Sequence, residues 1–249
     1  MSHIPSTLVI WLMLAVPALA LSGNAPPASG FAARSIVMVV DPRGDLCTGT
    51  ALASDLVLTA AHCVVAKLGY EVETFQAGRK ISVRAIALHS RFDLTSYAVS
   101  RATADVALLK LSAPLYDLVQ PAKLAPARRV VVGETLTVAG FGVTAAGTSH
   151  GLGIPRMATL VVTGKPGVLQ IRLFDLATRD LRAGLGACTG DSGAPVFDPN
   201  SEAVIGVVSW STAPRDEEGC GGLTGVTPLM LYRAWIIDTA RKFNSPLVQ

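Results

Sequence analysis

The 249-residue chain is poor in charged and aromatic side chains, which make up 16% and 6% of it. Its 21 Lys and Arg nearly balance 18 Asp and Glu and form no basic run, so nucleic acid is not an expected partner. With 50% hydrophobic residues, the chain is neither disordered nor a charged coiled coil. Ordinary numbers of Gly (23) and Pro (15) exclude collagen-like and low-complexity structure.

The chain also lacks an uncharged apolar run long enough to span a bilayer. Residues 8–16 form a run of nine apolar residues, followed by Pro17 and by Ala18-Leu19-Ala20, a small-x-small cleavage motif. We therefore predict a signal peptide at 1–20 and an exported, secreted or periplasmic protein beginning at Leu21, with no membrane partner after cleavage. A buried N-terminal helix or an uncleaved anchor are the alternatives. Residues 21–35 are expected to be a lead-in, unstructured over 22–30.

From residue 36 onward, short apolar runs alternate with turn residues, a pattern typical of an all-β fold. A parallel sheet would require helices of 10–15 residues between the strands, and the pattern contains none. Prolines interrupt residues 113–129 and divide the chain into two all-β halves, about 36–120 and 121–228, before a helix at 229–241. The predicted strands are 36–40, 56–59, 81–88, 106–111, 136–139, 157–162, 169–173 and 204–210.

A candidate nucleophile, Ser192, lies between small residues in Gly190-Asp191-Ser192-Gly193. Flanking glycines allow a backbone that exposes the hydroxyl and directs successive N–H groups to one point, as an oxyanion hole requires. The alternative is a glycine-rich turn with an incidental serine. A serine nucleophile also needs a base.

Histidine is scarce, so few bases are available. Of the four, His3 lies in the signal peptide, His150 in a polar loop and His89 at a strand end. His62 follows an apolar strand and precedes a cysteine that can fix its backbone. Asp105 opens another apolar strand, where a buried carboxylate needs a hydrogen-bond donor such as a histidine.

The order of these residues along the chain separates the possible folds. No histidine follows Ser192, which excludes an α/β-hydrolase. A subtilisin-like order would take its acid from Asp41, Asp45 or Asp55, on an α/β fold whose helices are missing. The order His62, Asp105, Ser192 is that of chymotrypsin-type enzymes.

The four cysteines permit three pairings into two disulfides, or a metal site. An exported chain favours disulfides. A zinc site built from Cys47, His62 and Cys63 lacks the usual ligand spacing, so no metal is expected.

Four motifs in this order are similar to those of the trypsin/chymotrypsin family of serine endopeptidases. The resemblance covers about residues 36–241 and implies two six-stranded antiparallel barrels, a cleft between them and a C-terminal helix. The motifs are Thr59-Ala60-Ala61-His62-Cys63, Asp105-Val106-Ala107-Leu108-Leu109, Gly190-Asp191-Ser192-Gly193 and Gly206-Val207-Val208-Ser209-Trp210.

The resemblance also implies residue roles: Ser192 as nucleophile, His62 as base and Asp105 as its partner, with no cofactor. It implies that the N–H groups of Gly190 and Ser192 form the oxyanion hole. The implied disulfides are Cys47 with Cys63 and Cys188 with Cys220.

The implied specificity pocket consists of Gly186, Ser209, Ser211 and Gly225. Gly186 stands where trypsin-type enzymes carry an acid, so we expect a neutral residue, rather than Lys or Arg, before the cleaved bond. Small residues at 211 and 225 should leave the pocket open.

Activation differs from the family pattern. Family zymogens release an Ile-Val-Gly-Gly terminus whose ammonium pairs with the acid before the nucleophile, here Asp191. Ile36 and Val37 follow Arg34-Ser35, but they lack the glycines and lie only about ten residues before Cys47. Residues 36–40 are therefore predicted to be the first strand, and Asp191 pairs with another N-terminus or with none.

The predicted protein is a monomeric endopeptidase acting on proteins or peptides. The alternatives are an inactive family member that acts as a binding protein, and an esterase using the same triad.

Overall fold

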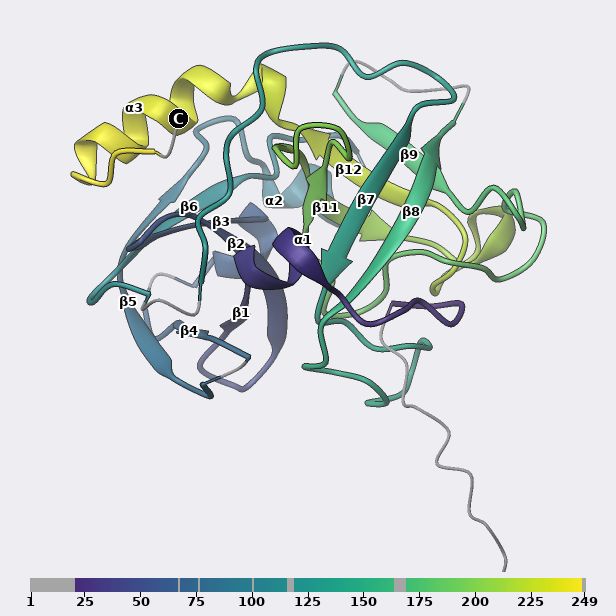
Figure 1. Cartoon of the computed structure of the whole chain (residues 1–249), viewed down its shortest axis with the longest axis horizontal. Coiled ribbons are helices and arrows are strands. Elements are labelled where there is room, and N and C mark those ends of the chain that lie inside the picture. Colours follow the sequence, from purple (N-terminus) through teal and green to yellow (C-terminus); the bar gives the residue numbers. More distant parts are fainter. Residues whose placement is uncertain are drawn as a thin grey trace, which may run out of the picture.

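The computed structural model describes residues 21–66, 68–75, 77–99, 101–115, 119–163 and 169–247. The expected signal peptide at 1–20 lies outside them. The described residues form two closed barrels that lie side by side (Figure 1). Within them, no helix has the length and apolar content needed to cross a membrane.

Each barrel contains six antiparallel strands, as the resemblance implied, and closure leaves no unpaired sheet edge. The first barrel has the order β1-β2-β3-β6-β5-β4 and the second β10-β11-β12-β9-β8-β7. The strands are β1 (Ile36–Val40), β2 (Leu46–Ala53), β3 (Leu56–Thr59), β4 (Glu71–Glu73), β5 (Lys80–Leu88), β6 (Ala107–Leu111), β7 (Thr135–Gly140), β8 (Arg156–Val162), β9 (Ile171–Phe174), β10 (Pro195–Phe197), β11 (Val204–Ser211) and β12 (Thr224–Pro228).

All eight predicted strands are present, with shifts of one or two residues at some ends. The strands β2, β4, β10 and β12 were missed. In β2, Gly and Thr interrupt the apolar residues. The strands β4 and β10 have only three residues each, and β10 begins with Pro195. Pairing with neighbours on both sides makes these segments strands, and local sequence carries little of that information.

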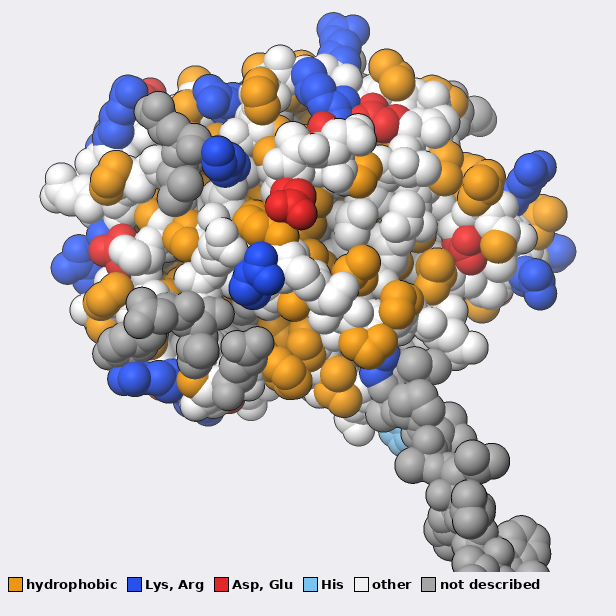
Figure 2. Space-filling view, in the orientation of Figure 1, with side chains coloured by type: hydrophobic (Ala, Val, Ile, Leu, Met, Phe, Trp, Pro, Cys, Tyr) orange, Lys and Arg blue, Asp and Glu red, His pale blue; other side chains and the backbone are white. Residues whose placement is uncertain are grey.

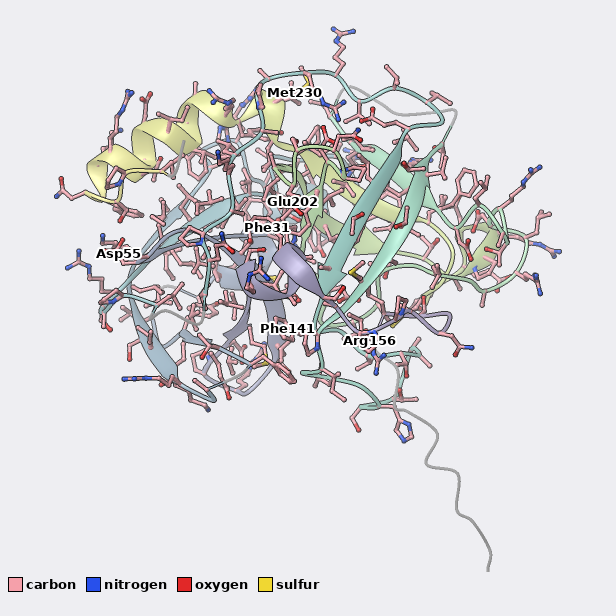
Figure 3. The ribbon with its side chains drawn as sticks, viewed as in Figure 1. Phe31, Asp55, Phe141, Arg156, Glu202 and Met230 are labelled. Atoms are coloured by element: carbon pink, nitrogen blue, oxygen red, sulfur yellow. A yellow bond between two sulfur atoms is a disulfide. The ribbon has the colours of Figure 1, made fainter. Side chains whose placement is uncertain are left out.

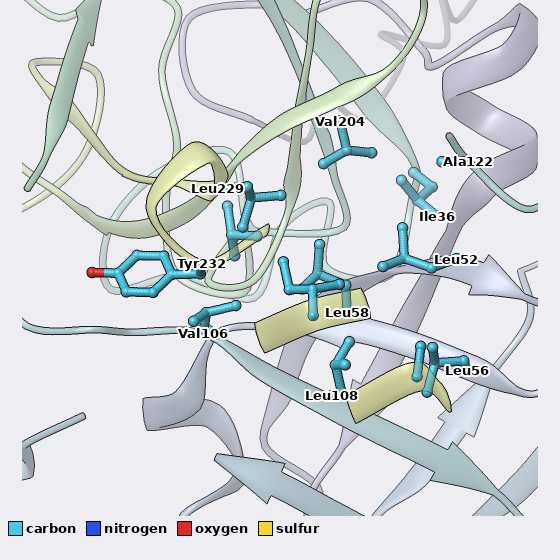
Figure 4. Packing of buried hydrophobic residues seen from close by; sticks show 14 of the residues in the cluster. Ile36, Leu52, Leu56, Leu58, Val106, Leu108, Ala122, Val204, Leu229 and Tyr232 are labelled. Carbon is cyan, nitrogen blue, oxygen red and sulfur yellow. The ribbon is translucent and has the colours of Figure 1, made fainter. Parts of the chain in front are cut away.

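An apolar cluster lies between the barrels and joins them (Figure 4). Leu52, Leu58 and Leu108 contribute from the first barrel, and Val204 and Leu229 from the second half of the chain. Two further clusters fill the barrels themselves. Because the joining cluster draws on both halves, the barrels pack as one body.

The helix predicted at 229–241 is two elements. The turn η3 (Leu229–Leu231) and helix α3 (Arg233–Lys242) meet at Tyr232, whose φ of −116° and ψ of 1° are not helical. The Tyr232 ring is buried and packs edge-on against His89, 4.8 Å between ring centres, which explains the break. Helix α3 returns to the first barrel and contacts β6 (Figure 1).

The lead-in is ordered, so the prediction that residues 22–30 are unstructured is wrong. Ser22 N–H donates to the Gly186 carbonyl at 3.1 Å, and Ala28 N–H donates to the Pro155 carbonyl at 2.9 Å. Helix α1 (Gly30–Ser35) follows directly. These partners are about 130 to 160 residues away in the sequence, so no local pattern could indicate them.

Candidate active site

His62 is held by the sequence that surrounds it. It lies in the turn η1 (Ala61–Val64), which begins two residues after β3 ends. Its neighbour Cys63 is bonded to Cys47 on β2, 16 residues earlier. The turn is thus tied covalently to the adjacent strand, which fixes the backbone that carries the imidazole.

Asp105 lies just before β6, with a side chain only 1% exposed, and faces His62. Its Oδ1 accepts the His62 backbone N–H at 2.9 Å, and its Oδ2 lies 2.8 Å from His62 Nδ1. An ionised carboxylate can only accept, so Nδ1 carries the proton and Nε2 is left as a base. The Ser209 hydroxyl donates to the same Oδ2 at 2.5 Å.

Tyr97, in helix α2 (Leu94–Ala98), completes the surroundings of His62 and was missed by the sequence analysis. Its ring stacks on the imidazole, 4.4 Å between centres and 13° between planes. Burial, together with the Asp105 carboxylate, raises the pKa of Tyr97 to about 12. The hydroxyl therefore keeps its proton and donates to the Ser209 carbonyl at 3.2 Å. An aromatic residue in so short a helix gives no local signal of this role.

Ser192 lies on a loop clamped between the barrels. Its carbonyl accepts the Thr48 N–H at 2.8 Å, and Gly193 N–H donates to the Val208 carbonyl at 2.8 Å. Thr48 follows Cys47, which is bonded to Cys63 beside His62. Two barrels thus bring His62 and Ser192, 130 residues apart in sequence, to one place.

Gly193 has no room for a side chain. Its φ is +82°, and a Cβ would lie 2.2 Å from both Thr48 O and Thr59 Oγ1. We expect Gly193→Ala to lower the free energy of unfolding by about 3 kcal/mol or more, from the strained φ and the forced displacement of Thr48. Urea denaturation measures the loss.

Gly147→Ala is the matched control for that substitution. Gly147 has φ of +72° and no atom within 4 Å of its Cβ position, so it carries the backbone strain without the clash. Its cost should be about 1 kcal/mol. Equal losses at both positions would contradict a steric requirement for glycine beside Ser192.

The N–H groups of Gly190 and Ser192, predicted as oxyanion-hole donors, have no acceptor among the described residues. Gly190 adopts φ of +95°, which favours glycine, and its carbonyl accepts the Thr48 hydroxyl at 2.8 Å. The Thr48 hydroxyl oxygen in turn accepts the Phe141 N–H at 3.1 Å. Thr48 therefore holds the loop from the first barrel, a role that the sequence did not indicate.

Ser192 Oγ makes no hydrogen bond within 3.5 Å to any residue that the structure describes. His62 Nε2 lies 3.7 Å from Cys63 Sγ. Contacts between nucleophile and base are often long in free enzymes and shorten when substrate binds. The arrangement supplies a base, a hydroxyl and two free N–H donors in one region.

Asp191 is fully buried beside Ser192. Gly142 N–H donates to its Oδ1 at 2.8 Å, and Cys188 N–H donates to its Oδ2 at 2.9 Å. Burial raises the pKa of Asp191 to about 7, although both N–H groups lower it. No described residue forms an ion pair with this carboxylate.

Both disulfides expected from the resemblance are present, Cys47–Cys63 and Cys188–Cys220. Cys47, His62 and Cys63 have ligand atoms within 4.8 Å of one another, the spacing of a metal site. Both sulfurs are bonded to each other, however, and a zinc ligand must be a thiolate. The cluster is therefore a structural link next to the imidazole.

The expected specificity pocket lies around the paired strands β11 and β12. A Cβ at Gly186 would lie 3.4 Å from Gly221 Cα and from Thr224 Oγ1, so position 186 accepts a side chain. A Cβ at Gly225 would lie 1.9 Å from the Trp210 indole, which covers this glycine. At this wall glycine leaves room for the indole ring, and a larger residue at 225 would displace it.

A hollow of about 230 Å³ lies beside Tyr97 and Ser209, which contact His62 and Asp105. It is lined by Tyr97, Ala98, Arg101, Thr103, Gln170, Ser209 and Trp210.

The family comparison agrees with this geometry: the trypsin family model matches residues 24–236. The chain belongs to the trypsin family. Its relatives include snake venom serine protease rhinocerase 4 of Bitis rhinoceros, 27% identical over 212 residues, 82% of this chain and 81% of the relative. A snake venom serine protease of Crotalus durissus durissus is also 27% identical, over 221 residues that cover 82% of this chain and 81% of the relative.

Solved structures of similar fold include human heparin binding protein, with a TM-score of 0.71 and 22% identity, covering 91% of this chain and all of that one. Mouse neuropsin, a serine protease, has a TM-score of 0.70 and 22% identity, and the match covers 87% of this chain and 98% of neuropsin. These likenesses show the fold. Membership of the trypsin family makes the chain a serine-type endopeptidase, a hydrolase.

Proposed function

We propose that this trypsin-family protein is an exported endopeptidase that cleaves peptide bonds with Ser192, His62 and Asp105 as its triad. The proposal rests above all on the hydrogen bond from His62 Nδ1 to Asp105 Oδ2, which leaves Nε2 unprotonated, while the His62 backbone N–H bond to Oδ1 fixes the pair. No cofactor takes part.

In the first half of the reaction, Ser192 Oγ attacks the substrate carbonyl carbon and its proton passes to His62 Nε2. The carbonyl oxygen becomes an oxyanion and accepts hydrogen bonds from the Gly190 and Ser192 N–H groups. The imidazolium is stabilised by Asp105 Oδ2, 2.8 Å from Nδ1. The carbon–nitrogen bond then breaks, the amine takes the proton from Nε2, and an acyl-enzyme remains.

In the second half, water replaces the amine. His62 Nε2 removes a proton as the water oxygen attacks the acyl carbon, and returns that proton to Ser192 Oγ when the ester bond breaks. A carboxylic acid leaves and the enzyme is regenerated. His62 and the two oxyanion-hole N–H groups act in both halves of the reaction, so weakening any of them slows both the formation and the hydrolysis of the acyl-enzyme.

Labelling with a fluorophosphonate tests this chemistry, because the reagent forms a covalent bond only with an activated serine. The parent should be labelled and Ser192→Ala should not, while Ser149→Ala, in an exposed turn, should be labelled like the parent. An unlabelled parent would favour an inactive binding protein. A labelled protein that hydrolyses esters but no peptide would favour the esterase.

The residue before the cleaved bond is proposed to be neutral. Gly186 and Ala187 place no carboxylate in the pocket region, so a Lys or Arg side chain would lose its hydration there without a partner. A peptide library should therefore show slow cleavage after Lys and Arg.

Gly186→Asp tests this specificity directly. Position 186 has ordinary van der Waals space for a Cβ, and an added carboxylate there should raise kcat/KM for cleavage after Arg by about 100-fold. Gly186→Asn has the same shape without the charge and should give no such gain. An Asn variant as active toward Arg peptides as the Asp variant would show that charge at 186 does not select the substrate.

Export is proposed from the signal sequence and from the relatives, which are named as venom proteins. Two disulfides suit an oxidising compartment. On the face in Figure 2, Lys and Arg side chains are dispersed, which suits protein or peptide substrates better than nucleic acid. We expect a monomer, and light scattering of the exported protein measures its mass.

A further inference from the structure

The hollow beside Tyr97 and Ser209 has a volume of about 230 Å³ and is bounded by both barrels. The first barrel contributes residues of helix α2 and of the segment that follows it, and the second contributes Gln170 and Trp210. Sites that hold drug-sized ligands begin at about 300 Å³, so this hollow suits one or two amino-acid side chains. Tyr97 stacks on His62, yet no step of the proposed reaction uses the hollow.

Strand β11 places the hollow next to the proposed specificity pocket. The pocket for the residue directly before the cleaved bond includes Ser209, Ser211 and Gly225. Trp210 lies between the two serines on β11, and its indole covers Gly225. We therefore expect a peptide whose side chain enters this pocket to place its preceding residues past Trp210, in the hollow.

The wall that carries Arg101 is fixed by hydrogen bonds. Arg101 N–H donates to the Ser96 carbonyl, in helix α2, at 2.9 Å. Two residues later, the Thr103 hydroxyl donates to the Arg91 carbonyl at 3.1 Å. The segment is thus tied at both ends to the loop that also carries Tyr97, so the fold sets the place of Arg101 beside the hollow.

Positive charge gathers at the hollow. Arg101 is exposed and is one of the residues that line it. Arg172 on β9 and Trp210 on β11 both pair with Gly225 of β12, and Arg172 Cζ lies over the indole, 5.7 Å from its ring centre. Neither arginine takes part in an ion pair with a residue that the structure describes.

No acidic side chain among the described residues lines the hollow. The acids of the adjoining segment are bound to other groups. Asp93, at the start of helix α2, accepts the Thr95 N–H at 3.0 Å and the Ser96 hydroxyl at 2.7 Å. Asp105 is bound to His62. Neither carboxylate is free to compensate the charge of Arg101.

Acids on other parts of the surface lie outside the lining as well. Figure 3 labels two of them, Asp55 in the turn between β2 and β3 and Glu202 just before β11. Asp55 is paired with Lys110 on β6, so its charge is compensated within the first barrel. A carboxylate brought by the substrate would supply the counter-charge that the hollow lacks.

A glutamate side chain matches the walls of the hollow along its whole length. Its methylene groups would pack against the rings of Tyr97 and Trp210, and its carboxylate would accept hydrogen bonds from the Arg101 guanidinium and the Gln170 amide. A Lys or Arg side chain in the same place would be repelled by Arg101 and Arg172.

We propose that this hollow is a carboxylate-binding subsite, in which Arg101 selects peptides with Glu or Asp two to four residues before the cleaved bond and Arg172 adds to the attraction. With a neutral residue directly before the bond, the substrate class is then acidic segments of proteins. The position of the bond relative to the hollow rests on the proposed function.

The first test measures cleavage of a peptide library by the full chain, exported with its own signal. Mass spectrometry locates each cleaved bond, and peptides with Glu two to four residues before it are compared with the same peptides carrying Gln. The parent should show kcat/KM about 10-fold higher for Glu. In about 1 M NaCl, where the Debye length is about 3 Å, this preference should shrink. Equal rates for Glu and Gln peptides at low salt would overturn the inference and leave the proposed function standing.

Substitution of Arg101 identifies the group that selects. Arg101→Gln should abolish the preference for Glu, Arg101→Lys should keep most of it, and Arg101→Glu should reverse it in favour of Lys. Rates on the Gln peptides should stay unchanged, which a merely structural role of Arg101 would not allow. Arg129→Gln, which removes an exposed arginine outside the lining, is the matched control and should keep the preference. An Arg101→Gln protein that selects Glu as the parent does would refute the role of Arg101.

Binding decides the inference even if no peptide is cleaved and the proposed function fails. Fluorescence anisotropy with the Ser192→Ala protein compares a labelled peptide of three successive Glu followed by Ala with its Gln counterpart. The Glu peptide should bind about 10-fold more tightly. Adding Arg101→Gln should make the two affinities equal. Equal affinities before that change, or binding of neither peptide, would refute the subsite.

Discussion

Ser192→Ala is expected to lower kcat/KM for peptide hydrolysis by about 10⁶-fold, the largest effect of any single substitution. Without Oγ no acyl-enzyme forms, and the oxyanion donors can assist only attack by water. The variant should fold normally, because the structure gives the Ser192 hydroxyl no hydrogen bond with any described residue and its carbonyl bond to Thr48 is unchanged. Progress curves with a fluorogenic peptide measure the rate of hydrolysis, and a denaturation curve measures the stability of the variant.

Ser149→Ala removes a hydroxyl from an exposed turn and should leave the rate unchanged. A Ser192→Ala protein that cleaves peptides as fast as this control would mean that another residue is the nucleophile. Because the stability of the variant is measured in parallel, loss of folding cannot be mistaken for loss of chemistry.

Asp105→Asn should lower kcat by about 10⁴-fold at neutral pH. The asparagine amide N–H₂ would donate to Nδ1, so the imidazole proton would move to Nε2. A protonated Nε2 cannot remove the proton from Ser192. The side-chain shape is kept, so binding of substrate, measured as KM, should change little. Steady-state kinetics separate the two parameters.

Ser209→Ala is the matched control, because the Ser209 hydroxyl binds the same Asp105 oxygen from the other side. It removes one hydrogen bond to the carboxylate but leaves the Nδ1 tautomer, so about a 10-fold loss in kcat is expected. A loss as large as that of Asp105→Asn would show that the carboxylate acts by its position in a network and not through the tautomer of His62.

Sequence patterns predicted the strands whose side chains are continuously apolar and missed those defined by pairing. The segment β3 is uniformly buried and was evident as an apolar run. The strand β10 has three residues, begins with proline, and is a strand because β7 and β11 pair with it on either side. Strand formation there depends on partners distant in the chain.

The residues of the proposed triad could be selected from the sequence because histidine is scarce and chain order excludes other arrangements. Tyr97 and Thr48 were not, although one stacks on His62 and the other anchors the Ser192 loop. A tyrosine in a five-residue helix and a threonine within a strand are ordinary locally. Their function arises from contact between the barrels.

The sequence by itself determined the candidates for the chemistry: Ser192 between glycines, His62 as the proposed base and Asp105 as its proposed partner, with cysteines near the first two. The tertiary structure decided what surrounds these groups. It bridged Ser22 to Gly186, laid the Trp210 indole over Gly225 and joined two barrels through one apolar cluster. The reason is physical: residue types set which reactions are possible, whereas burial and hydrogen bonding between distant segments set position, and position appears only when the chain is folded.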